Sequence, residues 1–261
     1  MTTDLARSLA QRHLDWIVPA WSGPPRVRAF FTTRHGGISK GAAATFDVGS
    51  ARPGPADDLV AVAENRRRLR ELLPADPVWL HQVHGNAVVT ITTAPAAPAA
   101  PPTADAAVTR AAATVLTVRT ADCLPLLFAN RAGTVLAVAH AGWRGLASGV
   151  VESTLAAMRV PAAEIVAWIG PAIGPLAFEV GPDVLAAFSA DDEAAAACFK
   201  PIREGKWMAD LPGLARARLA RAGVSEVAGR HWCTHTDAER FHSYRRDPRA
   251  GRMALLAWLA P

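Results

Sequence analysis

Residues 114–145, TVLTVRTADCLPLLFANRAGTVLAVAHAGWRG, contain two apolar runs that each lead into a candidate metal ligand. The runs Thr114–Val118 and Thr134–Ala139 are short and rich in β-branched and aliphatic residues, which favours buried strands. Cys123 follows the first run, and His140 follows the second. If the two strands are neighbours, their ends meet at one cleft, where the sites of α/β proteins gather. We therefore expect Cys123 and His140 to lie close together.

A third candidate ligand, His84, lies upstream in the segment 81–85, HQVHG, where His81 is the alternative. A cysteine thiolate and two neutral imidazoles suit Zn²⁺ or Cu²⁺ better than Mg²⁺ or Ca²⁺. Three protein ligands leave a fourth position for water or substrate, as in catalytic zinc sites. The ligands are too far apart in sequence for a zinc-finger spacing, so residue type alone also allows a buried free cysteine and ordinary loop histidines.

The C-terminal part of the chain contains a rival metal cluster. His231, Cys233 and His235 alternate, so a strand would place all three on one face, and His242 follows shortly after. On spacing alone, this cluster is the better match to a metal site.

The remaining apolar patterns predict an α/β chain without a strict strand–helix rhythm. Further strands are expected at Val27–Phe31, Val88–Thr92, Glu164–Ile169 and Met253–Leu259, and helices at Leu59–Leu73, Leu146–Met158, Pro182–Phe188 and Pro212–Ala222.

The composition fits one enzyme-sized domain. The chain has 261 residues, and compact units of about 200 to 250 residues are common. Hydrophobic residues make up 51% and charged residues 20%, which supplies a core and excludes a disordered protein. The net charge of +5 favours nucleic acid binding at first sight. The densest basic cluster, Arg66–Arg70, is flanked by Glu64 and Glu71 on a predicted helix, which indicates a solvated helix face and no nucleic acid partner.

The cysteine content and the chain start predict a cytoplasmic protein. Three cysteines are too few for a disulfide framework, and reduced Cys123 is what metal binding requires. The segment Met1–Trp21 lacks the pattern of a signal peptide, and no apolar run reaches the roughly 18 residues of a membrane span. We expect no membrane partner.

Seven ordered motifs carry a resemblance to a known family. They are FTTRHGGIS (31–39), LHQVHG (80–85), ADA (104–106), TADCLP (120–125), HAGWRG (140–145), IGPAIG (169–174), and CT (233–234) with FHSYRRD (241–247) and GR (251–252). Together they resemble the YfiH family, also called the laccase-domain, polyphenol oxidase or peptidoglycan editing factor family. The resemblance runs from about Phe30 to Trp258, so residues 1–261 are expected to form one domain with 1–26 as an N-terminal extension.

The resemblance implies a single α/β (α+β) domain with mixed sheets layered between helices, in the order helix, sheet, sheet, helix. It also implies that His84, Cys123 and His140 hold Zn²⁺, or alternatively Cu²⁺. The implied activity is phosphorolysis of the purine nucleosides adenosine, inosine, guanosine and methylthioadenosine, with deamination of adenosine. The expected partners are therefore a small nucleoside and phosphate.

Anionic substrate groups need donors, and arginine forks bind phosphate bidentately. Arg34, beside two glycines, is the first candidate, Arg245 the second and Arg144 the third. Trp143 either stacks on a flat base or packs beneath its loop. Asp47 replaces an asparagine that the family usually carries, which changes any substrate contact made there.

Three other functions remain open at this stage. Cys123 as nucleophile and His140 as base would suit an amidase that edits a cytoplasmic peptidoglycan precursor. A copper-dependent polyphenol oxidase is the second alternative, and a structural metal domain that binds a partner is the third. Asp122, next to Cys123, either orients a ligand imidazole or caps a loop.

Overall fold

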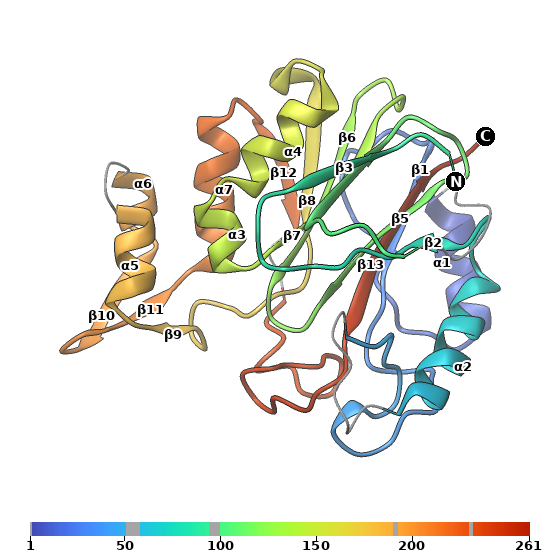
Figure 1. Cartoon of the computed structure of the whole chain (residues 1–261), viewed down its shortest axis with the longest axis horizontal. Helices are drawn as coiled ribbons and strands as arrows, with labels where there is room; N and C mark the ends of the chain where they lie inside the picture. Colours follow the sequence, from blue (N-terminus) through green and yellow to red (C-terminus); the bar gives the residue numbers. More distant parts are fainter. Residues whose placement is uncertain (1, 51–57, 94–99, 190–192, 230–231) are drawn as a thin grey trace.

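The computed structural model describes residues 2–50, 58–93, 100–189, 193–229 and 232–261 (Figure 1). A six-stranded sheet has the order β12 (Glu226–Gly229), β8 (Ile165–Ile169), β6 (Leu124–Asn130), β7 (Leu136–Ala141), β4 (Ala106–Thr109) and β3 (Val88–Ile91). A four-stranded sheet has the order β1 (Val27–Phe31), β13 (Met253–Leu259), β5 (Val115–Thr120) and β2 (Pro77–Val78). A small sheet has the order β10 (Phe199–Arg203), β11 (Lys206–Ala209) and β9 (Glu179–Val180).

Helices cover both outer faces of the two large sheets. The helices of the described residues are α1 (Thr2–Gln11), α2 (Leu59–Arg70), α3 (Trp143–Ala147), α4 (Val150–Met158), α5 (Pro182–Ser189), α6 (Glu193–Ala196) and α7 (Leu211–Arg221), with 3₁₀ turns at Gly41–Ala43 and Ala162–Glu164. Helices α3, α4 and α7 lie beside the six-stranded sheet, and α1 and α2 lie at the far side of the four-stranded sheet (Figure 1). The predicted order of helix, sheet, sheet, helix is confirmed.

Strand periodicity explains why the two sheets face each other. In β13, Leu255 and Ala257 join the core between the sheets, whereas Ala254 and Leu256 join the core beneath α1 and α2. Neighbouring residues of a strand point to opposite faces, so a strand that is buried on both sides is apolar throughout. All seven residues of β13 are buried. The continuous apolar run Met253–Leu259 is thus the sequence signature of a strand between two layers.

The element predictions were accurate where apolar runs were isolated. Val27–Phe31 and Met253–Leu259 match β1 and β13 in full. The predicted helix Leu146–Met158 is instead two helices that begin earlier, at Trp143, because Gly149 adopts a left-handed φ of +92° between α3 and α4.

The strands before Cys123 and His140 are not sheet neighbours, so the condition under which their ends would meet does not hold. β5 belongs to the four-stranded sheet, and β7 pairs with β6 and β4 in the other one. β6, which the sequence did not predict, is an uninterrupted buried run with Pro125 near its start, so it shows neither alternation nor the usual strand composition.

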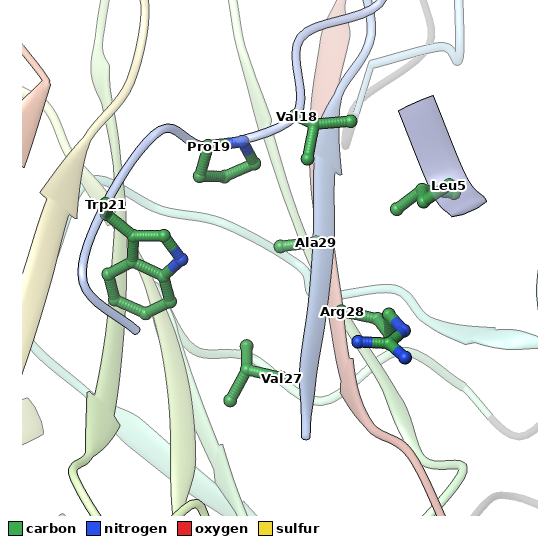
Figure 2. A pocket seen from close by; sticks show the side chains of 7 residues that line it. All are labelled: Leu5, Val18, Pro19, Trp21, Val27, Arg28 and Ala29. Atoms are coloured by element: carbon green, nitrogen blue, oxygen red, sulfur yellow. The ribbon is translucent and has the colours of Figure 1, made fainter. Parts of the chain in front are cut away.

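The segment before β1 packs against the four-stranded sheet. Trp16 stacks on Phe30 with ring centroids 5.4 Å apart, and Ile17 exchanges backbone hydrogen bonds with Phe31. Figure 2 shows Leu5 and Trp21 around a small cavity beside β1. Its volume is about 10 Å³, which is room for one water at most. Within the described ranges, no helix is long and apolar enough to cross a membrane.

His242 makes the fold sensitive to acid. It is fully buried, and its Nε2 donates to the carbonyl of Phe46 at 3.1 Å. Burial, together with the charges of Arg34, Arg252 and Arg246, lowers the pKa of His242 to about 3. The unfolded chain, with a histidine pKa near 6.5, therefore binds more protons between those two values, and stability falls as the pH drops through this window.

We expect His242→Gln to remove that part of the pH dependence, which amounts to roughly 1 to 2 kcal/mol between pH 6.5 and pH 5. Urea unfolding at several pH values measures it, with the exposed His13→Asn as control. An unchanged slope of unfolding free energy against pH in His242→Gln would contradict a neutral buried His242.

Candidate metal centre and substrate cavity

The strand register brings His140 and Cys123 together. In β7, the side chains of Leu136 and Val138 face the space between the two large sheets. Alternate residues of a strand share a face, so the side chain of His140 points the same way. β6 pairs with β7 so that Leu124 lies opposite Ala141 and Pro125 opposite His140. Cys123 directly precedes Leu124, so it lies at the same end of the strand pair as His140. The expected proximity is real, but a different strand pair produces it.

His84 completes a group of three side chains. Ligand atoms of His84, Cys123 and His140 all lie within 4.8 Å of one another. The two imidazole rings meet edge to face, with centroids 4.8 Å apart and planes at 80°. His140 is buried, Cys123 is partly buried and His84 is exposed, so the group opens toward solvent on the His84 side.

Gly142 is a close neighbour of this group. A Cβ at this position would lie 2.9 Å from Cys123 Sγ and 3.0 Å from His84 Cδ2, which is closer than such atoms normally approach. We expect Gly142→Ala to displace the thiol or the imidazole and to weaken metal binding by about 10-fold or more. Chelator competition measures the affinity. Gly41→Ala is the control for a glycine outside the cavity lining: nothing lies within 4 Å of a Cβ there, and its left-handed φ of +60° makes the substitution cost stability without touching the candidate ligands. Equal affinity in Gly142→Ala and the parent would contradict the packing described.

Asp105 holds two of the three candidate ligands in place. Its Oδ1 accepts hydrogen bonds from His140 Nδ1 at 2.8 Å and from the backbone N–H of His84 at 3.0 Å. Its Oδ2 accepts the N–H groups of Val83 and Gly85. Because Nδ1 of His140 is engaged, Nε2 is the nitrogen left for a metal. Sequence reasoning missed this role, although an aspartate beside an apolar run within a motif was the available signal.

The electrostatics of the pair favour a thiolate. Burial raises the pKa of Cys123, but the charge of His140 and hydrogen bonds from His140 and His84 outweigh it, so the pKa lies below its usual value. Burial lowers the pKa of His140, but the Cys123 thiolate and Asp105 outweigh it, so that pKa is raised. A thiolate is the form in which cysteine binds a metal or attacks a carbonyl.

Asp122 caps a loop rather than orienting an imidazole. Its carboxylate accepts hydrogen bonds from Thr234 Oγ1 at 2.6 Å, Ser243 Oγ at 3.0 Å and the Arg245 backbone N–H at 2.7 Å. Asp122 has a left-handed φ of +92°, and His84 has one of +62°. Such backbone is uncommon outside glycine and often occurs at functional sites. The loop 234–245 is thereby fixed next to Cys123.

A cavity of about 550 Å³ opens beside the three candidate ligands. It is large enough for a nucleoside. It is lined by Ser50, Gln82, Val83, His84, Arg119, Thr120, Ala121, Asp122, Cys123, His140, Gly142, Trp143, Arg144, Ile173, Phe178, Tyr244, Arg245 and Arg252. The lining includes four arginines and one carboxylate, that of Asp122, so it favours an anionic ligand.

Some of the predicted substrate-binding residues line the cavity and others do not. Arg245, Arg144 and Trp143 line the cavity, and the guanidinium of Arg144 lies over the Trp143 ring at 4.4 Å. Arg34 is not part of the lining, since its Nε and Nη1 donate to the carbonyls of Ala44 and Ala238. Within the described part of the chain, Arg34 therefore joins two loops.

His81 and Asp47 also lie outside the cavity lining. His81 pairs through its backbone with Thr103 and Pro102. Asp47 is buried, and its Oδ1 accepts the N–H groups of Gly49 and Arg252 at 2.7 Å each. An asparagine carbonyl could accept the same bonds, but the aspartate adds a negative charge behind Arg252.

The rival cluster lies partly outside the described residues. His231 lies outside them, and neither Cys233 nor His235 belongs to the group of three candidate ligands found there. Cys233 Sγ instead accepts the N–H of Gly174 at 3.2 Å, and the carbonyl of His235 accepts from Arg246.

A sequence profile described as "Multi-copper polyphenol oxidoreductase laccase" matches residues 28–260. The chain belongs to this laccase-domain family. It is 49% identical, over 94% of its length and 98% of the relative, to a purine nucleoside phosphorylase of Pseudomonas aeruginosa. It is also 49% identical to the Escherichia coli purine nucleoside phosphorylase YfiH, over 93% and 98% of the two chains.

A solved Neisseria meningitidis protein superposes on this laccase-domain chain with a TM-score of 0.89 and 43% identity, covering 95% of this chain and all of that one. YlmD from Geobacillus stearothermophilus superposes with a TM-score of 0.80 and 30% identity, over 91% and 93%. The match extends over both sheets and their helices, so the layered architecture is that of the family.

The three candidate ligands fit a single borderline metal ion. One thiolate held deprotonated by its neighbours and two imidazoles, one of them fixed by a carboxylate, are the donor set that Zn²⁺ and Cu²⁺ prefer. A multicopper centre needs more histidines than one such group supplies, and the described ranges hold one group.

Proposed function

We propose that this protein is a metal-dependent purine nucleoside phosphorylase that acts on adenosine, inosine, guanosine and methylthioadenosine, with adenosine deaminase activity at the same site. The observation that carries the proposal is the arginine-lined cavity of about 550 Å³ beside His84, Cys123 and His140. The names of the relatives support it. The reducing cytoplasm, where Cys123 stays a thiolate, is the proposed location.

Phosphorolysis joins a phosphate oxygen to C1′ of the sugar while the bond between C1′ and the base nitrogen breaks. Phosphate and base must therefore lie on opposite faces of the sugar. Trp143, Phe178 and Tyr244 supply flat apolar surface for the base, and Arg245 supplies positive charge toward an anion. Zn²⁺, or alternatively Cu²⁺, held by His84, Cys123 and His140 would supply a Lewis acid and lower the pKa of a water for deamination. Asp105 keeps His140 in the tautomer that binds through Nε2.

Product analysis tests this function. The zinc-loaded protein, incubated with inosine and phosphate, is expected to release hypoxanthine and ribose 1-phosphate in equal amounts. Omitting phosphate should stop both products. Hypoxanthine with free ribose, or no product above a Cys123→Ala control, contradicts phosphorolysis. Inosine formed from adenosine without phosphate checks the deaminase activity separately.

A second candidate function rests on the chain of hydrogen bonds that joins Cys123, His140 and Asp105. The thiol and imidazole are hydrogen-bonded, and Asp105 holds Nδ1 of the imidazole, as nucleophile, base and orienting acid do in cysteine hydrolases. This favours an amidase acting on a peptidoglycan precursor. Release of an amino acid from such a precursor by metal-free protein, abolished in Cys123→Ala, would support it over phosphorolysis. Oxygen uptake with a phenol only when copper is supplied would instead indicate a polyphenol oxidase.

A further inference from the structure

A second group of basic side chains lines the cavity where β5 ends and β13 begins. β13 runs antiparallel to β5, with Met253 opposite Thr120 and Ala254 opposite Arg119. Arg252, directly before β13, is therefore next to the end of β5. Arg119, Thr120 and Arg252 all line the cavity. None of the three was a candidate from the sequence, and no role in the proposed reaction has been given to them above.

Arg119 is held rigidly and is nine-tenths buried. Its exposed fraction is 7%. Nη1 donates to the carbonyl of Gly49 at 3.2 Å and Nη2 to the carbonyl of Leu80 at 2.6 Å, while Nε has no hydrogen-bond partner. The side-chain amide of Gln82 makes two hydrogen bonds to the Arg119 backbone. It accepts the Arg119 N–H and donates to the Arg119 carbonyl, at 2.9 Å each. A buried guanidinium fixed in this way is costly unless its charge is offset.

Among the described residues, the positive charges around Arg119 outnumber the carboxylate that acts against them. Burial and the charges of Arg66 and Arg252 lower the pKa of Arg119 to about 10, and Asp47 is the carboxylate that acts against them. Oδ1 of Asp47 already accepts two backbone N–H groups. Nη1 of Arg252 donates to the carbonyls of Ala250 and Gly251, so its other N–H groups are available to a bound anion.

Two guanidinium groups in one cavity wall form a donor set that suits a phosphoryl group. Arg119 and Arg252 both line the cavity, and the charge of Arg252 acts on Arg119. Guanidinium groups bind phosphoryl oxygens through parallel N–H donors. Thr120 follows Arg119 on β5, so its side chain points to the opposite face of the strand and is not part of this donor set.

We propose that Arg119 and Arg252 form a subsite for a phosphoryl dianion in this cavity. The role of the bound phosphoryl group as a substrate rests on the proposed phosphorolysis, but the binding of that group does not. The group is either inorganic phosphate, the second substrate, or the phosphate ester of a nucleotide. Neither arginine is a candidate metal ligand, so the subsite is expected to bind phosphate with or without metal.

Equilibrium dialysis of the full chain against radiolabelled inorganic phosphate tests the subsite, before and after chelator treatment. One phosphate per chain is expected in both states. Arg252→Gln should weaken binding by about 10-fold or more, since a charged hydrogen-bond donor is lost, and Arg252→Lys should lie between. Arg131→Gln, which removes one charge from a surface pair with Glu226, should change binding less than twofold. Thermal melting of each variant checks that it folds.

Competition by adenosine 5′-monophosphate separates the two sources of the phosphoryl group. Binding of inorganic phosphate that depends on Arg252 assigns the subsite to free phosphate. Binding of the nucleotide alone, again dependent on Arg252, assigns it to a phosphate ester. If neither ligand binds, or if Arg252→Gln binds like the parent, or if chelation abolishes binding, the subsite is wrong.

Steady-state kinetics distinguish a failure of the phosphate subsite from a failure of the proposed phosphorylase function. Inosine phosphorolysis with an unchanged KM for phosphate in Arg252→Gln would overturn the subsite and leave the phosphorylase intact. Phosphate binding that depends on Arg252 without any release of base would leave the subsite intact and overturn the phosphorylase. A rise of about 10-fold in KM for phosphate, with KM for inosine nearly constant, is the expected pattern.

Discussion

Replacement of Cys123 by alanine is expected to lower the rate of inosine phosphorolysis by about 1,000-fold or more. Cys123 is the one thiolate in the group with His84 and His140. Without it, two histidines remain, of which His84 is exposed, so the metal affinity should fall steeply. A residual group of two imidazoles does not hold a borderline ion at micromolar free metal.

The measurement compares initial rates of base release at saturating metal and phosphate. Cys198→Ala is the matched control, because Cys198 is also a partly buried cysteine outside any disulfide but does not line the cavity. It should retain activity within about twofold, as expected of a substitution away from the site. Full activity in Cys123→Ala would show that the reaction uses neither this thiolate nor a metal bound to it.

Replacement of Asp105 by asparagine should have the next largest effect, a loss of about 10- to 100-fold in metal affinity and rate. The carboxylate accepts four hydrogen bonds, from His140 Nδ1 and from the backbone of Val83, His84 and Gly85. An amide of the same size can accept some of them, but it removes the negative charge that fixes the tautomer of His140.

Chelator competition gives the metal affinity of Asp105→Asn, and urea unfolding gives its stability. Asp76→Asn, which removes a carboxylate from an exposed pair with Arg70, is the control and should change neither by much. A stable Asp105→Asn protein with parental metal affinity would contradict the orienting role. A loss of activity that excess metal restores in part would support it.

The residues alone were sufficient for elements whose apolar run is isolated, whereas the grouping of the three candidate ligands also needed the resemblance to the family. Val27–Phe31 and Met253–Leu259 were predicted to the residue because polar segments border them. His84, Cys123 and His140 were grouped by residue type and by the ordered motifs, and the structure brings them within 4.8 Å.

Features that depend on three-dimensional pairing were not predictable. Whether β5 lies beside β7 or in another sheet depends on β6, whose run Leu124–Asn130 has no alternation to identify it. Asp105 and Asp122 are both acids next to apolar runs, yet one fixes His140 and the other a distant loop. Arg34 was the first anion-donor candidate from the sequence and Arg119 was none, yet Arg119 lines the cavity and Arg34 does not.

The central claim, that one metal ion is held by Cys123 with His84 and His140, is tested most directly by cobalt substitution. The Co²⁺-loaded protein should contain one ion per chain and show a thiolate-to-metal charge-transfer band in the near ultraviolet. The band should be absent in Cys123→Ser and retained in Cys233→Ser. A band that persists in Cys123→Ser, or that disappears in Cys233→Ser, would place the metal elsewhere and contradict the account.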